Sequence, residues 1–379
     1  MDVSHVVHVS SSYPPDIGGM ERVVEELSEA LAEELASSVE VVTGGRGTSR
    51  GTRREGNVVV RRLWVFNVLA TPVIPGLAWT LMRGPRPQLL HVHIAHAGTP
   101  EVAALVARLR GIPFMAHVHI DAVPTSWMGR LLGVYQKFIL ARVLARAALV
   151  IVPTESYRPV LLDKYNLDPA RVRVLPNGTH MPKREPHDAS TWTSGSPVHL
   201  VRVGRVDPEK NVSLLLDAVE LLVNKDHLDI DLEVVGDGTD WDHVLAHIER
   251  LGIGSHVRMV GRLSGSELVD AYDRGDIFIM TSLSESFGLV LVEAMARGIP
   301  VIAPDIPGVR DVVIDGVTGL LIDYRAESLR HAVLRILQEP GLRAKLIRGA
   351  REQSDRYEWP AIARQCAQLY EDALSAPKG

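Results

Sequence analysis

Two acidic residues eight positions apart, Glu285 and Glu293, lie in the mostly apolar stretch SESFGLVLVEAMARG of residues 284–298. A helix over this stretch is apolar nearly all round and should be buried, so a carboxylate at Glu293 is costly unless a partner binds it. Glu285 stands ahead of the helix, beside backbone amides that a helix N-terminus leaves free, those of Phe287, Gly288 and Leu289. The stretch therefore offers amides for a phosphate and two carboxylates for the hydroxyl groups of a sugar. One capping acid and one buried structural ion pair are the alternative.

A second loop, VGRVDPEKN at residues 203–211, follows an expected strand and precedes an expected helix. It places a guanidinium, Arg205, and an ammonium, Lys210, five residues apart at the carboxyl edge of a sheet. Two cations beside a helix N-terminus are typical of an anion site for a diphosphate. Salt bridges from these cations to Asp207 and Glu209 are an equally open interpretation.

A third loop, PPDIGGME at residues 14–21, also joins a strand to a helix. Gly18 and Gly19 lack side chains where a backbone would approach a ligand, and the helix behind them offers free N–H groups to an anion. The pattern is not GxGxxG, and Glu40 is poorly placed as a ribose-binding acid, which disfavours a nicotinamide enzyme. A plain glycine-rich turn is the alternative.

Several histidines fall on two neighbouring strands of the first half, and His91 and His93 share one strand face. Such a pair is typical of a metal site, but apart from Asp121 no carboxylate or cysteine stands nearby to complete the ligand set. We therefore expect no metal, and interpret the group as lining a ligand site, with a core histidine among them; its members are His91, His93, His96, His117 and His119. The sequence Asp229-Ile230-Asp231 resembles a metal-binding DxD but opens a strand, and we expect a solvated strand edge there.

Strand-length apolar runs alternate with helical patterns along the whole chain, which predicts parallel α/β domains. Expected strands are 5–10, 39–43, 58–63, 89–93, 114–117 and 149–153 in the first half, and 198–203, 230–235, 257–260, 277–280 and 301–303 in the second. Expected helices are 20–35, 101–109, 212–223, 241–251, 266–272, 289–297, 326–338 and 361–374. For the helix at 289–297, Ser284 or Ser286 can form the N-cap, and Gly298 followed by Pro300 can end it.

One stretch, Pro182–Pro197, is rich in proline, serine, threonine and charge, and we interpret it as the linker between two similar domains. The predicted domains are residues 1–181 and 198–360, with the C-terminal helix, within 361–379, packing back on the first. Ligands of such sheets bind at the carboxyl ends of the strands, so a cleft between the domains is the expected site.

The composition excludes several classes of protein. The 379 residues are 46% hydrophobic and 23% charged, typical of a globular chain and not of a disordered one or a coiled coil. The formal net charge of −5 argues against a nucleic-acid partner. A single cysteine, Cys366, excludes an intrachain disulfide, and no signal peptide or spanning segment is recognisable, so we expect a cytoplasmic protein.

Taken together, these motifs resemble the retaining glycosyltransferases of family 4, which have the GT-B fold of two facing Rossmann-like domains. The resemblance rests on PPDIGGME, His117 in FMAHVHID, LPNG at 175–178, VGRVDPEKN, VVGDG at 234–238 and ESFGLVLVEAMARGIPVIA with its two glutamates, all in family order. It implies an N-terminal acceptor domain and a C-terminal nucleotide-sugar domain. It also implies a donor most often linked to UDP and no requirement for a metal or other cofactor.

Carried over to this sequence, the resemblance assigns roles to the residues already singled out. Arg205 and Lys210 would hold the diphosphate and offset charge on the leaving group, Glu293 would bind the ribose hydroxyls, and Glu285 the transferred sugar. The amides of Phe287, Gly288 and Leu289 would touch the sugar or the β-phosphate, and Gly18 and Gly19 would let the first loop close on the donor. His117 would reach the sugar from the acceptor domain, with His119 as a weaker competitor.

The implied reaction is transfer of a sugar to a hydroxyl with retention of configuration, by same-face attack that the leaving phosphate assists. A sugar phosphorylase, a sugar-nucleotide epimerase on the same fold and a non-catalytic sugar-nucleotide binding module are the alternatives. The acceptor is a small molecule or a lipid-linked glycan. The apolar, arginine-bearing segments 127–146 and 63–82 could form a surface that contacts anionic lipid, or could be core-packing elements with snorkelling arginines.

Overall fold

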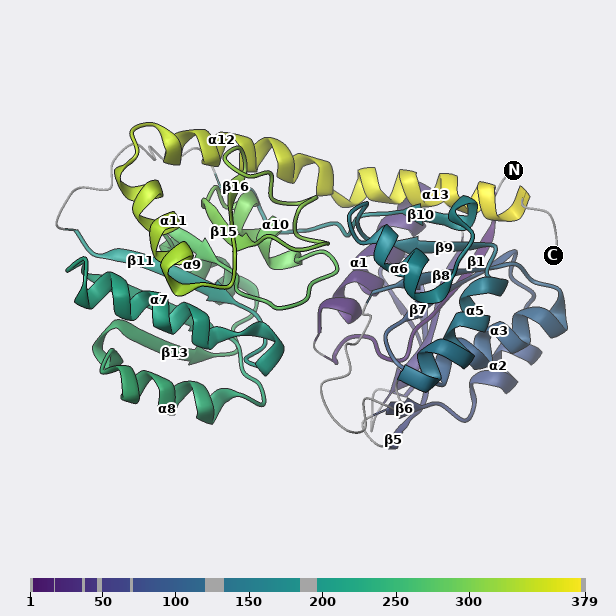
Figure 1. The fold of residues 1–379 in the computed structure, drawn as a ribbon. Coiled ribbons are helices and arrows are strands. Elements are labelled where there is room, and N and C mark those ends of the chain that lie inside the picture. Colours follow the sequence, from purple (N-terminus) through teal and green to yellow (C-terminus); the bar gives the residue numbers. More distant parts are fainter. Residues whose placement is uncertain are drawn as a thin grey trace. The chain divides into compact units, whose positions relative to one another are not determined.

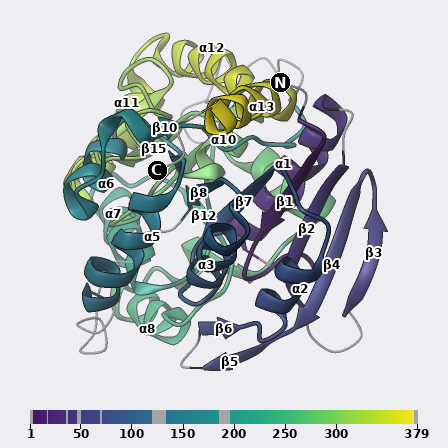
Figure 2. The same cartoon turned by 90° about the vertical axis from the view of Figure 1, so that its right-hand side faces the viewer.

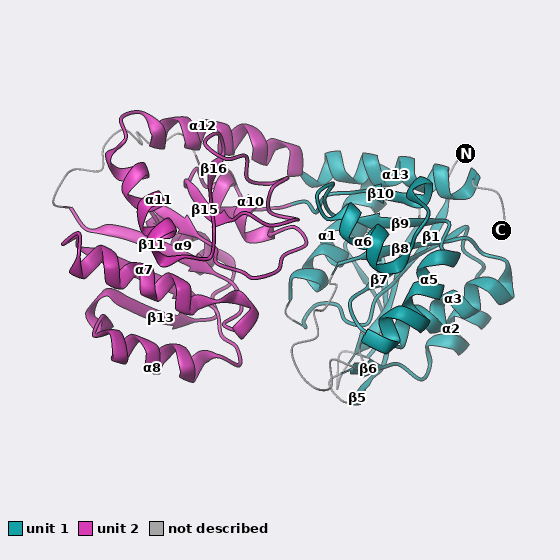
Figure 3. Cartoon of the chain, in the orientation of Figure 1, with its two compact units in different colours: residues 1–178, 358–379 teal, residues 179–357 magenta. Residues whose placement is uncertain are grey.

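The computed structural model describes residues 3–16, 18–35, 38–45, 50–68, 71–119, 133–184 and 196–375. The chain divides into two compact units (Figure 3): unit 1 is residues 1–178 with 358–379, and unit 2 is residues 179–357. Of the predicted linker, residues 185–195 lie outside the described residues. Within the described residues, no helix is both long and apolar enough to cross a membrane.

Unit 1 contains an eight-stranded sheet with the strand order β10-β9-β8-β7-β1-β2-β4-β3. Every neighbouring pair is parallel except β3 with β4. A separate antiparallel pair, β5 with β6, lies apart from this sheet. The strands are β1 (His5–Val9), β2 (Ser38–Gly45), β3 (Gly51–Glu55), β4 (Val58–Trp64), β5 (Phe66–Val68), β6 (Thr71–Val73), β7 (Leu89–Ile94), β8 (Phe114–Val118), β9 (Leu149–Val152) and β10 (Val172–Val174).

Helices cover both faces of this sheet (Figures 1 and 2). One core cluster joins the sheet to α1 and α13, and another joins it to α2, α3, α5 and α6. The helix α13 comes from the C-terminus of the chain and packs on α1. The helices are α1 (Gly19–Glu34), α2 (Leu77–Arg83), α3 (Thr99–Arg110), the π-helix η2 (Gln136–Leu140), α5 (Ala141–Arg146), α6 (Arg158–Tyr165), the 3-10 turn η3 (Pro169–Arg171) and α13 (Trp359–Ser375).

Unit 2 contains a six-stranded, wholly parallel sheet with the order β13-β12-β11-β14-β15-β16. Its strands are β11 (Val198–Val203), β12 (Ile230–Val235), β13 (Val257–Gly261), β14 (Ile277–Ile279), β15 (Val301–Pro304) and β16 (Gly319–Ile322). Its helices are α7 (Val212–Asn224), α8 (Trp241–Leu251), α9 (Gly265–Arg274), α10 (Leu289–Ala296), α11 (Ala326–Gln338) and α12 (Leu342–Ser354), with 3-10 turns η4 (Pro208–Lys210), η5 (Gly254–His256) and η6 (Asp355–Tyr357).

In each sheet the strand order reverses beside the first strand of the unit. The chain winds from β11 through β12 to β13 in one direction and from β14 to β16 in the other, and β1 stands in the same way between β2 and β7. Ligands of open parallel sheets bind outside the carboxyl ends of the strands at such reversals. In unit 2 the loops at this position follow β11 and β14.

The alternation of apolar runs and helices predicted this architecture correctly. All eleven expected strands are present within a few residues of their predicted bounds. The strands that were not predicted lack a long apolar run. The strand β3 has the sequence GTRRE, and β5, β6 and β10 contain three residues each.

A buried tryptophan attaches α13 to the rest of unit 1. Trp359 is 1% exposed, and its indole N–H donates to Glu26 Oε2 at 2.6 Å. A Cβ at Gly178 would lie 2.4 Å from the indole ring, so the backbone itself packs against this ring.

We expect Trp359→Ala to lower the free energy of unfolding by about 3–5 kcal/mol, because it leaves a large cavity and an unpaired acceptor. Denaturant unfolding followed by circular dichroism measures the loss. Gln365→Ala, at an exposed position of the same helix, is the matched control. Equal stability of the two variants would contradict this account of how α13 is held.

Candidate functional site

The loop after β11 holds both predicted cations of unit 2. After Val203 the chain turns through Gly204 at φ +134°, forms the 3-10 turn η4 and enters α7 through Asn211 at φ +48°. The loop is tied to the loop after β14, because the Leu283 N–H donates to Glu209 O at 2.8 Å and Thr281 Oγ1 donates to Lys210 O at 3.0 Å. The structure thus brings together two motifs that are about seventy residues apart in sequence.

Each predicted cation contacts an acid of the same unit. Lys210 Nζ lies 2.8 Å from Glu285 Oε2, and both side chains are largely buried. Arg205 is 59% exposed and pairs with Asp207 and with Glu209, the latter at 2.6 Å. The foreseen salt bridges to Asp207 and Glu209 are therefore present for Arg205 only, whereas Lys210 pairs with Glu285 of the loop after β14.

The helix α10 begins differently from the prediction. Its N-cap is Gly288 at φ +81°, with no side-chain cap, so neither Ser284 nor Ser286 caps it. Glycine suits this position because other residues rarely adopt this positive φ. A β-carbon here would also lie 2.8 Å from Leu291 Cδ1. The predicted end is correct: the helix stops at Ala296, and Gly298 takes φ +72°.

The buried acid of α10 has a partner in the neighbouring helix. Glu293 is 2% exposed and accepts a 2.7 Å hydrogen bond from the Tyr272 hydroxyl of α9. Ahead of this helix, the N–H groups of Phe287, Gly288 and Leu289 donate to no acceptor among the described residues. The loops after β11 and β14 therefore carry Arg205, Lys210, Glu285 and the three free amides, and Glu293 lies behind them in α10.

Sequence reasoning missed one residue of this region, Arg202. It is 3% exposed, and its guanidinium donates to the carbonyl oxygens of Gly204 and Arg205, under the loop that carries the cations. Burial lowers its pKa to about 10, partly offset by the nearby carboxylates of Asp207 and Glu285, so it stays protonated at neutral pH. The sequence signal that could have identified Arg202 is its charge, because it stands inside the largely apolar strand VHLVRV.

In unit 1 the predicted glycines lie at the start of α1. Gly18 is extended, and a β-carbon there would lie 2.1 Å from a Glu21 carboxylate oxygen, which provides a structural reason for glycine. Gly19 is exposed and has open space at its β-carbon position. The carboxylate of Glu21 accepts a 2.5 Å hydrogen bond from Ser12 Oγ of the preceding loop.

Five buried imidazoles form a connected chain beneath α1 and α13. Strand register puts His8 opposite His91, and His93 opposite His117, on one face of the sheet. Each link of the chain is 2.8–3.1 Å long, in the order His117 Nδ1–Nε2 His91, His91 Nδ1–OH Tyr370, Tyr370 OH–Nε2 His8, His8 Nδ1–Nε2 His93 and His93 Nδ1–Nε2 His119.

The direction of one hydrogen bond sets all the others in this chain, because a neutral imidazole has one N–H and one acceptor nitrogen. Ser28 Oγ donates to Val24 O at 2.5 Å, so its 3.3 Å contact with His8 Nδ1 requires His8 to be the donor. In that direction His117 donates from Nδ1. Its Nε2 is then a buried acceptor with no partner among the described residues.

Two sets of these histidines have nitrogens within 4.8 Å of one another, which is spacing that could hold a metal ion: His8 with His91 and His93, and His93 with His117 and His119. Both ring nitrogens of His8, His91 and His93 are already used in the hydrogen-bonded chain. The charged groups that act on the pKa values of His91, His93 and His117 are other histidines. Among the described residues, which do not include Asp121, a divalent ion here would therefore lack a compensating carboxylate.

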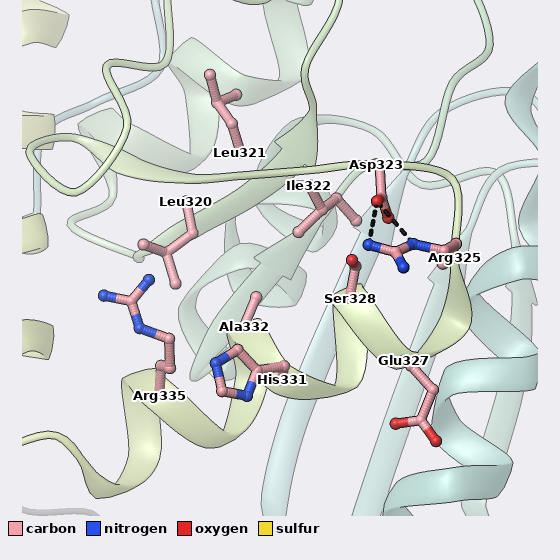
Figure 4. Close-up of a pocket in the computed structure, with 10 residues that line it drawn as sticks. All are labelled: Leu320, Leu321, Ile322, Asp323, Arg325, Glu327, Ser328, His331, Ala332 and Arg335. Atoms are coloured by element: carbon pink, nitrogen blue, oxygen red, sulfur yellow. Dashed lines mark hydrogen bonds and ion pairs between the residues drawn. The ribbon is translucent and has the colours of Figure 1, made fainter.

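A pocket of about 440 Å³ lies between β16 and α11 in unit 2 (Figure 4). Asp323 and Arg325 pair with each other at its rim. None of the predicted site residues lines it. The lining residues are Leu320, Leu321, Ile322, Asp323, Arg325, Glu327, Ser328, His331, Ala332 and Arg335.

Comparison with known proteins matches both halves of the chain. Residues 17–181 match the family described as Glycosyltransferase Family 4, and residues 184–353 match Glycosyl transferases group 1. A D-inositol 3-phosphate glycosyltransferase of Frankia alni is 32% identical over 97% of this chain and 98% of its own length. The chain belongs to glycosyltransferase family 4.

Other relatives of this family-4 glycosyltransferase agree in length and fold. A glycogen synthase of Mycobacterium tuberculosis is 27% identical, over 99% of this chain and 95% of its own. Among solved structures, a sucrose-phosphate synthase of Thermosynechococcus elongatus superposes with a TM-score of 0.77 at 22% identity, covering 99% of this chain and all of the other. Anabaena HepE in complex with UDP-glucose gives 0.76 at 19% identity, covering 97% and 99%. The fold is GT-B.

For the family-4 site we expect Arg202→Met to raise the donor KM about tenfold, because the carbonyls of Gly204 and Arg205 lose their charged donor and the loop relaxes. Arg202→Lys should recover part of the loss. Steady-state kinetics with varied donor measure it, and Arg258→Met, which removes a half-exposed arginine from the same sheet, is the control. An unchanged donor KM would contradict this positioning role.

The histidine chain predicts that stability falls in acid. Burial lowers the pKa of His8 and of His119 to about 3, whereas an unfolded histidine titrates near 6.5. Below pH 6.5 the unfolded state therefore binds more protons than the folded one, and each such histidine costs about 2 kcal/mol between pH 7 and pH 5.

Denaturant unfolding at pH 7.5, 6 and 5 tests this expectation. His8→Gln should reduce the slope of stability against pH, whereas His243→Gln, at an exposed position, should not. A free energy of unfolding that stays constant from pH 7 to pH 5 would show that the cluster titrates normally.

Proposed function

We propose that this enzyme transfers a sugar from a nucleoside diphosphate, UDP in the first place, to a hydroxyl of a small-molecule or lipid-linked acceptor, with retention of configuration. The observation that carries the proposal is the Lys210–Glu285 pair at 2.8 Å. It joins the loop after β11, whose cations suit a diphosphate, to the loop after β14, whose carboxylate suits the hydroxyl groups of a sugar. The structures of HepE with UDP and with UDP-glucose support the choice of donor.

In the proposed donor complex, Arg205 and Lys210 move from their carboxylate partners to the diphosphate. The free amides at the start of α10 bind phosphate or sugar oxygens, as helix N-termini do. Glu293 accepts from the ribose hydroxyls, and Glu285, released by Lys210, accepts from the transferred sugar. Unit 2 is then the donor domain and unit 1 the acceptor domain.

The chemical step follows from this arrangement. The acceptor hydroxyl oxygen attacks the anomeric carbon on the face that the diphosphate leaves, the bond from that carbon to the phosphate oxygen breaks, and the hydroxyl proton passes to the leaving phosphate. Negative charge grows on the diphosphate as the bond breaks, and Arg205 and Lys210 stabilise it. We propose that these two cations replace a metal, and that no cofactor is needed.

Two histidines are candidates for the sugar contact from unit 1, and we assign it to His119. His119 follows the carboxyl end of β8, where ligands of parallel sheets bind, and is 7% exposed. His117 lies within β8 and is 0% exposed, and its Nδ1–H donates a hydrogen bond to His91 on the same face of the sheet. In this proposal His117 holds the network beneath the site, and Gly18 and Gly19 open the first loop to the donor.

A screen of nucleotide release from UDP-, GDP- and ADP-sugars tests the function, because slow hydrolysis of the true donor needs no acceptor. We expect Lys210→Ala to lower kcat at saturating donor at least tenfold, a loss of about 1.4 kcal/mol or more of transition-state stabilisation. Lys225→Ala is the control, since Lys225 pairs with Glu327 at an exposed position.

An unchanged kcat for Lys210→Ala would exclude its role at the leaving group. Binding of a sugar nucleotide without release of nucleotide for any acceptor would instead favour a binding module. The anomeric configuration of the product, read by NMR, tests retention separately.

A further inference from the structure

The helices α2, α3, η2 and α5 cover one face of the sheet of unit 1, and the β5–β6 pair directly precedes α2 in the chain; together they are here called the outer layer. The inner faces of its helices are buried against the sheet through Leu77 of α2, Val106 of α3 and Leu144 of α5. The helices pack against one another: α2 packs on α3, and α3 packs on η2 and α5. Arg110 of α3 also donates to the carbonyl oxygens of Leu81 and Gly84 at the end of α2. Figures 1 and 2 show α2 and α3 side by side.

The outward side of this layer is unusually apolar. Trp79 is 63% exposed, Leu109 66% and Trp64 54%. Large exposed apolar side chains elsewhere in the described chain are fewer and spread over both units, namely Val160, Leu245, Leu283, Ile314, Val317 and Tyr324. The outer layer and its flanking residues carry Trp64, Phe66, Val68, Trp79, Met82, Leu105, Leu109, Val134, Phe138 and Ile139. Such concentration marks an interaction surface.

The charge of the same part of the chain is strongly positive. Residues 57–154 contain ten arginines and lysines against two acids, Glu101 and Asp121, a formal charge of +8 in a chain of −5. Glu101 is engaged inside the layer, where it accepts from the Gly98 N–H and from the Tyr135 hydroxyl. The exposed cations of the layer are Arg83, Arg86, Arg108, Lys137, Arg142 and Arg146.

Aromatic rings of this surface lie beside a cation and beside one another. The Arg83 guanidinium lies 4.0 Å from the centre of the Trp79 ring, and the rings of Trp64 and Phe66 are 5.0 Å apart. Tryptophan is enriched at the boundary between hydrocarbon and headgroups, and arginine stems can lie along apolar surface while their charges reach phosphates.

We propose that the outer layer docks on the surface of an anionic lipid bilayer. Its apolar side chains would enter the headgroup boundary, and its six exposed cations would pair with lipid phosphates. A second copy of the chain fits less well, because a symmetric contact would bring two positively charged layers together. Segment 127–132, which the sequence also favours for this surface, lies outside the described residues.

Docking would place the enzyme where lipid-linked acceptors are, and so favours them over free small molecules. This consequence rests on the proposed transfer function, whereas the docking itself does not.

Co-sedimentation of the full chain with vesicles tests the docking. We expect binding to phosphatidylcholine vesicles that contain 30% phosphatidylglycerol, and at least tenfold weaker binding to pure phosphatidylcholine. Arg83→Glu/Arg146→Glu should weaken binding by about fivefold or more for each charge lost. Phe66→Ser/Trp79→Ser should weaken it at least tenfold, whereas Leu245→Ser/Ile314→Ser, which changes two exposed apolar residues of unit 2, should bind like the unchanged protein.

Thermal unfolding checks that each variant is folded, and donor hydrolysis without vesicles should stay unchanged in all of them, which separates a failure of docking from a failure of the transfer function. Equal binding to both kinds of vesicle, or binding unaffected by the outer-layer variants, would overturn the proposal. A dimer seen by light scattering would also overturn the proposal if the same variants dissociated it. The surface would then be an interface between two copies of the chain.

Discussion

The charged loops of unit 2 depend on one partly buried ion pair, Lys210 with Glu285. It joins loops that leave adjacent strands at the point where the strand order of the sheet reverses. Each charge there has an opposite charge beside it, so these loops are assembled without leaving a buried ion unpaired. In the proposed donor complex an incoming diphosphate is the better partner for the cations, and the carboxylate is then free for sugar hydroxyls. The net charge of −5 conceals this local arrangement.

Rigid surroundings keep these exchangeable groups in place. Arg202 holds the carbonyls of the β11 loop from below, and Tyr272 orients the buried Glu293. In unit 1, neutral histidines cover one face of the central strands and hydrogen-bond to one another and to Tyr370. Burial and the cost of placing several positive charges together keep them neutral, so their network is polar without carrying charge.

Much of this could be predicted from the sequence, because the information is local. Apolar runs of five or six residues located the central strands, and motif order located the loops with Arg205, Lys210 and Glu285. What could not be predicted depends on distant contacts. The bond from His91 to Tyr370 joins residues 279 positions apart. The Gly288 cap is a local exception, because the chain enters α10 at φ +81°, a conformation that glycine adopts readily and serine rarely. The polar strand β3 gave no periodic signal.

A crystal structure of the chain with bound UDP would test the central claim most directly. The account predicts that Lys210 Nζ leaves Glu285 and lies about 3 Å from a phosphate oxygen, with the Arg205 guanidinium on the same diphosphate and Glu293 at hydrogen-bond distance from the ribose. A nucleotide bound elsewhere, or bound here with the Lys210–Glu285 pair intact, would contradict it.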